Sequence, residues 1–337
     1  MAMHTMAELK QRQALPLEVK ILMTKQRIRE WIDEFGEDGV YISFSGGKDS
    51  TVLLHLVRQD FPNVKAMFVD TGLEYPEVRS FAMSQENVDV VRPKMTFKQV
   101  ITEYGYPFIS KEVSHKVACV VKNPNSKYAK YFDGTSKGSL YNCERYKYLL
   151  NAPFKLSRKC CDIMKKSPAH AYEKATGRVK ITGTMAEESR LRTQKWIQNG
   201  CNAFDTKSPT SNPMSFWTEQ DVLRYIKEYN IEIAKVYGKV VIDYDSDIDE
   251  PLDGQIDFSD FGLYLDNRKL KTTGCSRTGC MFCGYGCHLN NDQRFVLMKK
   301  THPKQYDYIM RPESKGGLNY KEIIDWLNEH GNFYINY

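Results

Sequence analysis

Short apolar runs rich in β-forming residues alternate along the chain with longer stretches of helical spacing. The runs predict four buried strands, and the stretches between them predict helices. The predicted strands are VYISF (40–44), VKAMFVD (64–70), VDVVRP (88–93) and VKIT (179–182). Strands that alternate with helices indicate a parallel sheet with crossover helices on both faces, a Rossmann-like α/β fold.

Helical spacing is clearest in four segments, two of which carry terminus signals. Pro16 lies near the start of the first, and Thr218 is suited to cap the third. The predicted helices cover 8–35, 51–59, 218–230 and 322–330.

We therefore expect an N-terminal helical segment at 1–36, a nucleotide-binding domain at 37–235 and a cysteine-rich C-terminal region at 236–337. Within the domain, 122–147 is rich in Asn, Ser, Gly, Lys and Tyr and predicts a long surface loop. The acidic stretch 243–266 predicts an irregular connection to the cysteines.

No apolar run is long enough to span a membrane, and the polar N-terminus lacks the apolar core of a signal peptide. We therefore expect a cytoplasmic protein without a membrane partner. Positive charge is concentrated at 111–195, which contains nineteen Lys or Arg residues and seven acidic ones. This excess favours a polyanionic ligand, although a solvated surface would have the same composition.

A glycine-containing turn follows the first predicted strand and opens a helix. Its sequence is Ser45-Gly46-Gly47-Lys48-Asp49-Ser50. Two glycines let the backbone approach a phosphate, and the helix presents free N–H groups and its positive dipole end to the anion. The spacing is not that of a Walker A loop. Lys48 supplies a cation, and Asp49 is suited to hold Mg²⁺ or to position the loop.

Two further turns follow predicted strands. Asp70, Thr71 and Gly72 come after the second strand, and Gly183 follows the fourth. Ligands of open parallel sheets bind at the carboxyl ends of strands, so these turns are candidate nucleotide contacts. Arg190 and Arg192 lie downstream and are candidates for bidentate phosphate contacts, with a solvent-exposed role as the alternative.

Four of the nine cysteines lie within a short glycine-rich stretch at 275–287. A Cys-x-x-Cys pair such as Cys280 and Cys283 places two thiolates around one metal centre. Four thiolates suit either Zn²⁺ or a [4Fe–4S] cluster. Buried free cysteines would not explain this spacing.

Together these motifs resemble the phosphoadenylylsulfate (PAPS) reductase-like branch of the adenine nucleotide alpha-hydrolase (PP-loop ATP pyrophosphatase) superfamily. The resemblance covers about 40–288, and this chain has Met185 where the family often has arginine. It implies that ATP binds with Mg²⁺, that the loop grips the β- and γ-phosphates, and that Lys48 and Asp49 are catalytic. The expected nucleotide-binding residues are Ser43, Ser45, Gly46, Gly47, Lys48, Asp49, Ser50, Asp70, Thr71, Gly72, Gly183 and Arg190.

The iron–sulfur sulfonucleotide reductases of this branch pair an upstream Cys-Cys with a distant Cys-x-x-Cys. The resemblance thus implies a [4Fe–4S] cluster, with zinc as the alternative. Cys280 and Cys283 belong to every ligand set, and Cys275 is the next choice. Cys161 is the expected fourth ligand, with Cys160 and Cys287 as alternatives.

Two functions fit these motifs. One is an ATP pyrophosphatase that adenylates an acceptor and supports sulfur transfer, similar to the sulfur-transfer proteins of DNA phosphorothioation and to tRNA thiolases. The other is a PAPS or APS reductase. The complete loop and the absence of any cysteine after Cys287 favour the first. Lysines and tyrosines at 127–147 suit DNA or tRNA, and a cysteine desulfurase is the expected sulfur donor.

Overall fold

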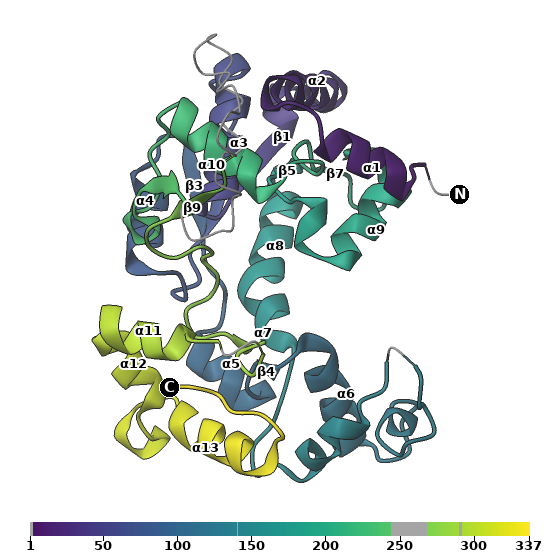
Figure 1. The fold of residues 1–337 in the computed structure, drawn as a ribbon, viewed down its shortest axis with the longest axis vertical. Coiled ribbons are helices and arrows are strands. Elements are labelled where there is room, and N and C mark those ends of the chain that lie inside the picture. The colour runs from purple at the N-terminus through teal and green to yellow at the C-terminus, as the bar shows by residue number, and fades with distance from the viewer. Residues whose placement is uncertain (1–2, 140, 244–267, 290–291) are drawn as a thin grey trace, which may run out of the picture. The chain divides into compact units, whose positions relative to one another are not determined.

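The computed structural model describes residues 3–139, 141–243, 268–289 and 292–337 (Figure 1). The acidic connection expected at 243–266 lies outside these residues, apart from Asp243. The chain divides into two compact units, each assembled from separate sequence segments rather than from the contiguous domains expected above. The first unit contains Met1–Val69, Tyr75–Val91 and Tyr172–Thr278; the second contains Asp70–Glu74, Arg92–Ala171 and Gly279–Tyr337.

A six-stranded sheet with the order β3-β2-β1-β5-β7-β6 forms the centre of the first unit. Its strands are β1 (Val40–Phe44), β2 (Ala66–Val69), β3 (Val88–Val91), β5 (Val179–Thr182), β6 (Asn202–Ala203) and β7 (Thr210–Ser211). Every neighbouring pair is parallel except β6 and β7. All four predicted strands are present, and helices flank the sheet, so the predicted α/β class is confirmed. A separate antiparallel pair joins β8 (Val240–Ile242) and β9 (Leu270–Thr272).

The helices of the first unit follow the apolar spacing of the sequence. They are α1 (Met6–Gln13), α2 (Leu17–Phe35), α3 (Lys48–Asp60), α4 (Pro76–Ser84), α9 (Arg190–Asn199) and α10 (Glu219–Glu228). The single helix expected at 8–35 is two helices, because Pro16 adopts extended backbone angles and ends the first one. Thr218 caps α10 as predicted, with Asp221 completing the capping box. Helix α3 packs against β1 and contacts α2 and α10.

The second unit is mainly helical. It contains α5 (Phe97–Tyr104), α6 (Lys111–Lys122), α7 (Lys159–Cys161), α11 (Arg294–Thr301), α12 (Pro303–Met310) and α13 (Tyr320–His330). Strands β4 (Phe108–Ile109) and β10 (Gly284–Tyr285) form a short parallel pair, and the fully buried Tyr320 donates a hydrogen bond to the Phe282 carbonyl at 2.6 Å. A π-helical turn at Asp162–Lys166 connects α7 to α8 (Ser167–Thr176), which continues from one unit into the other.

The segment expected as a loop at 122–147 contains short 3₁₀ helices at Ala129–Tyr131 and Glu144–Asn151. Within the described ranges, no helix is both long and apolar enough to cross a membrane.

Candidate functional site

The phosphate-loop candidate lies between β1 and α3, as the sequence predicted. Gly46 has a φ of +71°, and a Cβ atom there would lie 2.9 Å from both Cγ1 and the carbonyl oxygen of Val78. Only glycine fits this turn, because the backbone is left-handed and passes close to α4. Gly47 precedes the first residue of α3, and the space that its side chain would fill faces the hydroxyls of Ser45, Tyr237 and Thr278.

Hydroxyl groups of the loop hold its shape. Ser50 Oγ donates to the Gly47 carbonyl at 2.9 Å and lies 3.0 Å from Ser45 Oγ. Ser50 Oγ also accepts a hydrogen bond from the Ser45 backbone N–H, at 3.2 Å. The loop is therefore shaped by its own residues and offers backbone donors at the start of a helix, where an anion is stabilised.

Lys48 is buried, with 3% of its side chain exposed. Its Nζ lies 3.1 Å from Glu219 Oε1 and donates to the Ser276 carbonyl at 3.1 Å. Asp49 is next to it, and burial raises the pKa of its carboxyl group while Lys48 opposes that shift. The buried Oδ1 atom of Asp49 pairs with Lys48 Nζ at 3.5 Å and accepts no hydrogen bond among the described residues. A carboxylate oxygen beside the phosphate loop is a suitable ligand for Mg²⁺.

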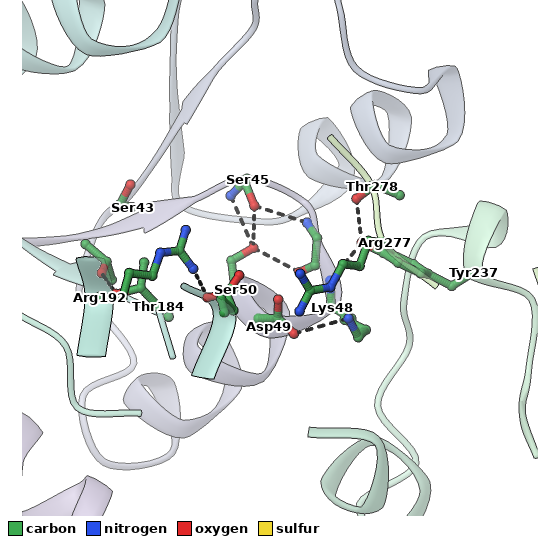
Figure 2. Close-up of a pocket in the computed structure, with 14 residues that line it drawn as sticks. Ser43, Ser45, Lys48, Asp49, Ser50, Thr184, Arg192, Tyr237, Arg277 and Thr278 are labelled. Atoms are coloured by element: carbon green, nitrogen blue, oxygen red, sulfur yellow. Dashed lines mark hydrogen bonds and ion pairs between the residues drawn. The ribbon is translucent and has the colours of Figure 1, made fainter. Parts of the chain in front are cut away.

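A cavity of about 340 Å³ opens beside the loop (Figure 2). Figure 2 shows Arg192 and Arg277 approaching from opposite sides, with Ser50 and Asp49 between them. Seven of the predicted residues line this cavity: Ser43, Ser45, Gly47, Lys48, Asp49, Ser50 and Gly183. Arg190 is exposed and does not line it, whereas Arg192 does. Two residues apart on a helix point in different directions, so the sequence could not choose between these arginines.

The cavity also contains residues that the sequence interpretation missed. Tyr237 accepts a hydrogen bond from the Lys48 backbone N–H at 3.2 Å, and its hydroxyl lies 2.5 Å from Thr278 Oγ1. Arg277 adds a cation, and Glu188 is ion-paired with Arg192. Arg277 and Thr278 lie inside the cysteine-rich stretch 275–287, which the sequence alone indicates only as a metal site. The cysteines therefore drew attention away from the contribution of this stretch to the cavity.

The Asp-Thr-Gly turn belongs to the second unit. Thr71 closes it by donating from its hydroxyl to Glu74 at 2.6 Å, and Asp70 accepts from Arg92 Nε at 3.1 Å. Gly72 has a φ of +72°, which explains the glycine. None of the predicted nucleotide contacts in this turn lines the phosphate-loop cavity of the first unit.

Thiols of the second unit gather around the start of the π-helical turn. Burial raises the pKa of the Cys160 thiol, and the neighbouring Cys280, Cys161 and Cys283 raise it further. Burial also raises the pKa of Cys280 to about 11, although a hydrogen bond with Lys165 opposes the shift. Cys161, Cys280 and Cys283 therefore all lie close enough to Cys160 to influence its thiol.

Two other cysteines considered as ligands differ from these four. Cys275 belongs to the first unit, where its thiol lies near Tyr75 and Glu77. Cys287 is buried in the second unit, where burial raises its pKa to about 12 and Cys283 is a lesser influence. The set with Cys275 stays a prediction, and Cys160, one of its alternatives, lies near the other three thiols.

In the described part of the chain, no group of three or more His, Cys, Asp or Glu side chains has the geometry to hold a metal ion. Thiolates are the donors of both zinc sites and [4Fe–4S] clusters, so the choice between the two stays a prediction.

A parallel sheet with a glycine-containing anion loop at the carboxyl end of β1 defines a nucleotide-binding α/β protein. Residues 39–285 match the model of the phosphoadenosine phosphosulfate reductase domain. The chain belongs to this family, and the resemblance inferred from its motifs is confirmed.

Relatives in the family are enzymes of sulfate and sulfonucleotide chemistry by name. Sulfate adenylyltransferase subunit 2 of Shewanella frigidimarina is 27% identical over 63% of this chain and 64% of its own length. Adenosine 5′-phosphosulfate reductase of Staphylococcus haemolyticus is 26% identical over 60% of this chain and 67% of its own. The PAPS reductase of Candida auris, a solved structure, aligns over 63% of this chain and 82% of its own, with 14% identity and a TM-score of 0.37.

Proposed function

We propose that the protein is an ATP pyrophosphatase that adenylates an acceptor and supports transfer of sulfur to it. The observation that carries this proposal is the complete phosphate loop. It combines the buried Lys48, helix N–H donors and the Asp49 carboxylate, whose Oδ1 pairs with Lys48, in one cavity. Such a loop is suited to bind the β- and γ-phosphates of a nucleotide. A sulfonucleotide lacks these phosphates and has much less need of the loop.

In the proposed step, an acceptor oxygen attacks the α-phosphorus of ATP. A new O–P bond forms, the bond to the bridging oxygen of the β-phosphate breaks, and pyrophosphate leaves with that electron pair. The acceptor proton passes to solvent. Lys48, Arg192 and Arg277 neutralise the developing charge of the leaving group. Asp49 is the residue that would hold Mg²⁺, which would supply positive charge beside the phosphates when bound.

The thiols of Cys160, Cys161, Cys280 and Cys283 support a [4Fe–4S] cluster as part of this proposal. Such a cluster would supply iron and sulfide for sulfur chemistry when bound. The residues around it have separate roles: Lys165 holds the Cys280 thiol by a hydrogen bond, and Cys160 is buried while the other three thiols are partly exposed.

The second candidate function is reduction of PAPS or APS, and the names of the family and of several relatives favour it. That reaction requires a thiolate to attack the sulfur of the sulfonucleotide. Residues 288–337 contain no cysteine, so this stretch offers no thiol for the attack.

Calorimetry with Mg·ATP, PAPS and APS tests the choice between these functions. We expect ATP to bind, and pyrophosphate to be released as the adenylyl group passes to the acceptor once the acceptor is present. AMP should leave only when a sulfur nucleophile then displaces it from the acceptor. Lys48→Ala and Asp49→Ala should remove most of this binding or turnover, while Lys10→Ala, on the exposed side of α1, should leave both unchanged. Tight PAPS binding without ATP binding would reverse the ordering of the two functions.

DNA or tRNA is the proposed acceptor, with a cysteine desulfurase as the sulfur donor. Exposed lysines at 122–147 lie over tyrosine rings, for example Lys127 over Tyr128 at 5.4 Å and Lys130 over Tyr131 at 5.4 Å. Binding through phosphates should weaken steeply with salt, with a logarithmic slope of roughly −0.9 per contact for B-DNA. A flat salt response would remove nucleic acid from the proposal.

A further inference from the structure

A second cavity lies beside the phosphate-loop cavity within the first unit. It has a volume of about 540 Å³, which is within the usual range for small-molecule sites. Thr182, Thr184 and Arg192 line both cavities, so the two are adjacent. The walls are the carboxyl end of β5, the start of β7, helix α9 and the 204–209 connection that carries Thr206, Lys207 and Ser208.

Positive charge dominates this cavity. Lys180, Arg192, Lys195 and Lys207 line it, and no Asp or Glu is among its lining residues. Lys180 pairs with Glu173 and Arg192 pairs with Glu188, but neither Lys195 nor Lys207 has an ion-pair partner within the described ranges. Cations that line a concave surface and are not neutralised by acidic groups, as Lys195 and Lys207 are not, raise the local concentration of anions.

The neutral part of the lining also favours an anion. The Ser208 hydroxyl accepts a hydrogen bond from Lys180 at 3.4 Å, so its own proton is available to a ligand on that side. Trp196 lines the cavity with only 2% of its surface exposed, and its buried indole N–H has no hydrogen-bond partner in the described structure. A buried donor without an acceptor costs free energy, so a bound oxyanion that reached it would recover part of that cost.

The orientation of the shared wall is fixed by a small hydrogen-bond group. Thr182 and Thr184 both donate to Asn212 Oδ1 at 2.6 Å. This group sets the position of the residues between the two cavities, so that a molecule in the second cavity would lie next to the phosphates in the first.

We propose that the second cavity binds a phosphate or similar oxyanion group of the second substrate, and thereby holds the acceptor beside the nucleotide. The identity of the neighbouring nucleotide rests on the proposed function, whereas the preference for an anion rests on the lining of this cavity alone. Lys195 and Lys207 are the binding residues, because their charges are not neutralised by the protein.

Equilibrium dialysis with radiolabelled inorganic phosphate tests the proposal without requiring turnover. We expect two binding sites in the wild-type protein. Lys195→Gln/Lys207→Gln should weaken one of them by about tenfold or more, since two charge-assisted contacts are lost. Lys48→Ala should weaken the other. The control Lys10→Gln/Lys174→Gln removes the same charge from exposed positions outside the cavity and should retain both sites.

A second experiment tests whether the anion in the second cavity belongs to the nucleotide or to another molecule. Phosphate should still bind at the Lys195 site when a non-hydrolysable ATP analogue occupies the loop. Displacement of phosphate from that site by the analogue would show that the nucleotide itself fills the cavity, and would overturn the proposal. Equal phosphate binding by the Lys195/Lys207 variant and its control would also overturn it. If phosphate binds at the Lys195 site but ATP is not cleaved, only the proposed function is rejected.

Discussion

Gly46 illustrates how one residue sets the geometry of the phosphate loop. We expect Gly46→Ala to lower the free energy of unfolding by roughly 2–4 kcal/mol, because it combines left-handed strain with overlap against Val78. Gly177→Ala is the matched control. Gly177 also has a φ of +71°, but no atom lies within 4 Å of its Cβ position, so we expect a loss of about 1 kcal/mol. Chemical denaturation measures both, and equal losses would contradict the close approach to α4.

His55 makes the free energy of unfolding depend on pH. Burial lowers its pKa, with a smaller effect from Lys25, and its Nδ1 lies 2.8 Å from the Tyr225 hydroxyl. The unfolded chain therefore binds more protons than the native state as pH falls below about 6.5. The free energy of unfolding should decrease over this acidic range and should not depend on His55 above neutral pH.

His55→Gln, which cannot take up a proton, should reduce the slope of stability against pH in the acidic range. Denaturation at pH 8 gives the cost of the substitution itself, and the comparison at pH 5.5 gives the titration effect. An unchanged slope would show that His55 is as easily protonated in the native state as in the unfolded chain.

Helices α2 and α10 are joined by a buried ion pair. Lys20 Nζ lies 2.7 Å from Asp221 Oδ2, and both side chains are at least nine-tenths buried. Asp221 also accepts from the Thr218 backbone and hydroxyl in the capping box. One carboxylate therefore stabilises the start of α10 and fixes that helix against α2.

We expect Lys20→Met to lower the free energy of unfolding by roughly 3–5 kcal/mol, because it leaves the Asp221 charge buried and unpaired. Lys20→Met/Asp221→Asn should recover part of the loss, since the charge is then removed. Denaturation of the single and double variants measures the coupling. No recovery in the double variant would indicate that lost packing, rather than the unpaired charge, causes the effect.

At the scale of the whole molecule, cysteines from distant segments define the candidate metal centre. Anaerobically purified protein should be brown and contain about four irons. Serine at Cys160, Cys161, Cys280 or Cys283 should remove or strongly reduce the colour and iron content. Cys201→Ser and Cys275→Ser, both in the first unit, should retain them. Loss of iron in Cys275→Ser, or one zinc in place of iron, would contradict this ligand set.

The local part of the structure was predictable from the sequence. The strands, the Thr218 cap and the phosphate loop each depend on residues close together in the chain, so their apolar period and turn chemistry are visible without a fold. The helix break at Pro16 was missed, although the missing N–H of proline was a signal for it.

Only the tertiary structure decided which distant residues complete each site. It brought Tyr237, Arg277 and Thr278 to the loop, and it placed Arg192 rather than Arg190 in the lining of the cavity. It also revealed the cationic second cavity, whose residues come from several elements. Local sequence patterns show which residues are buried and where the chain turns. The contacts within each cavity depend instead on the order of the strands in the sheet, because that order brings remote segments together. No short-range pattern in the sequence predicts the strand order.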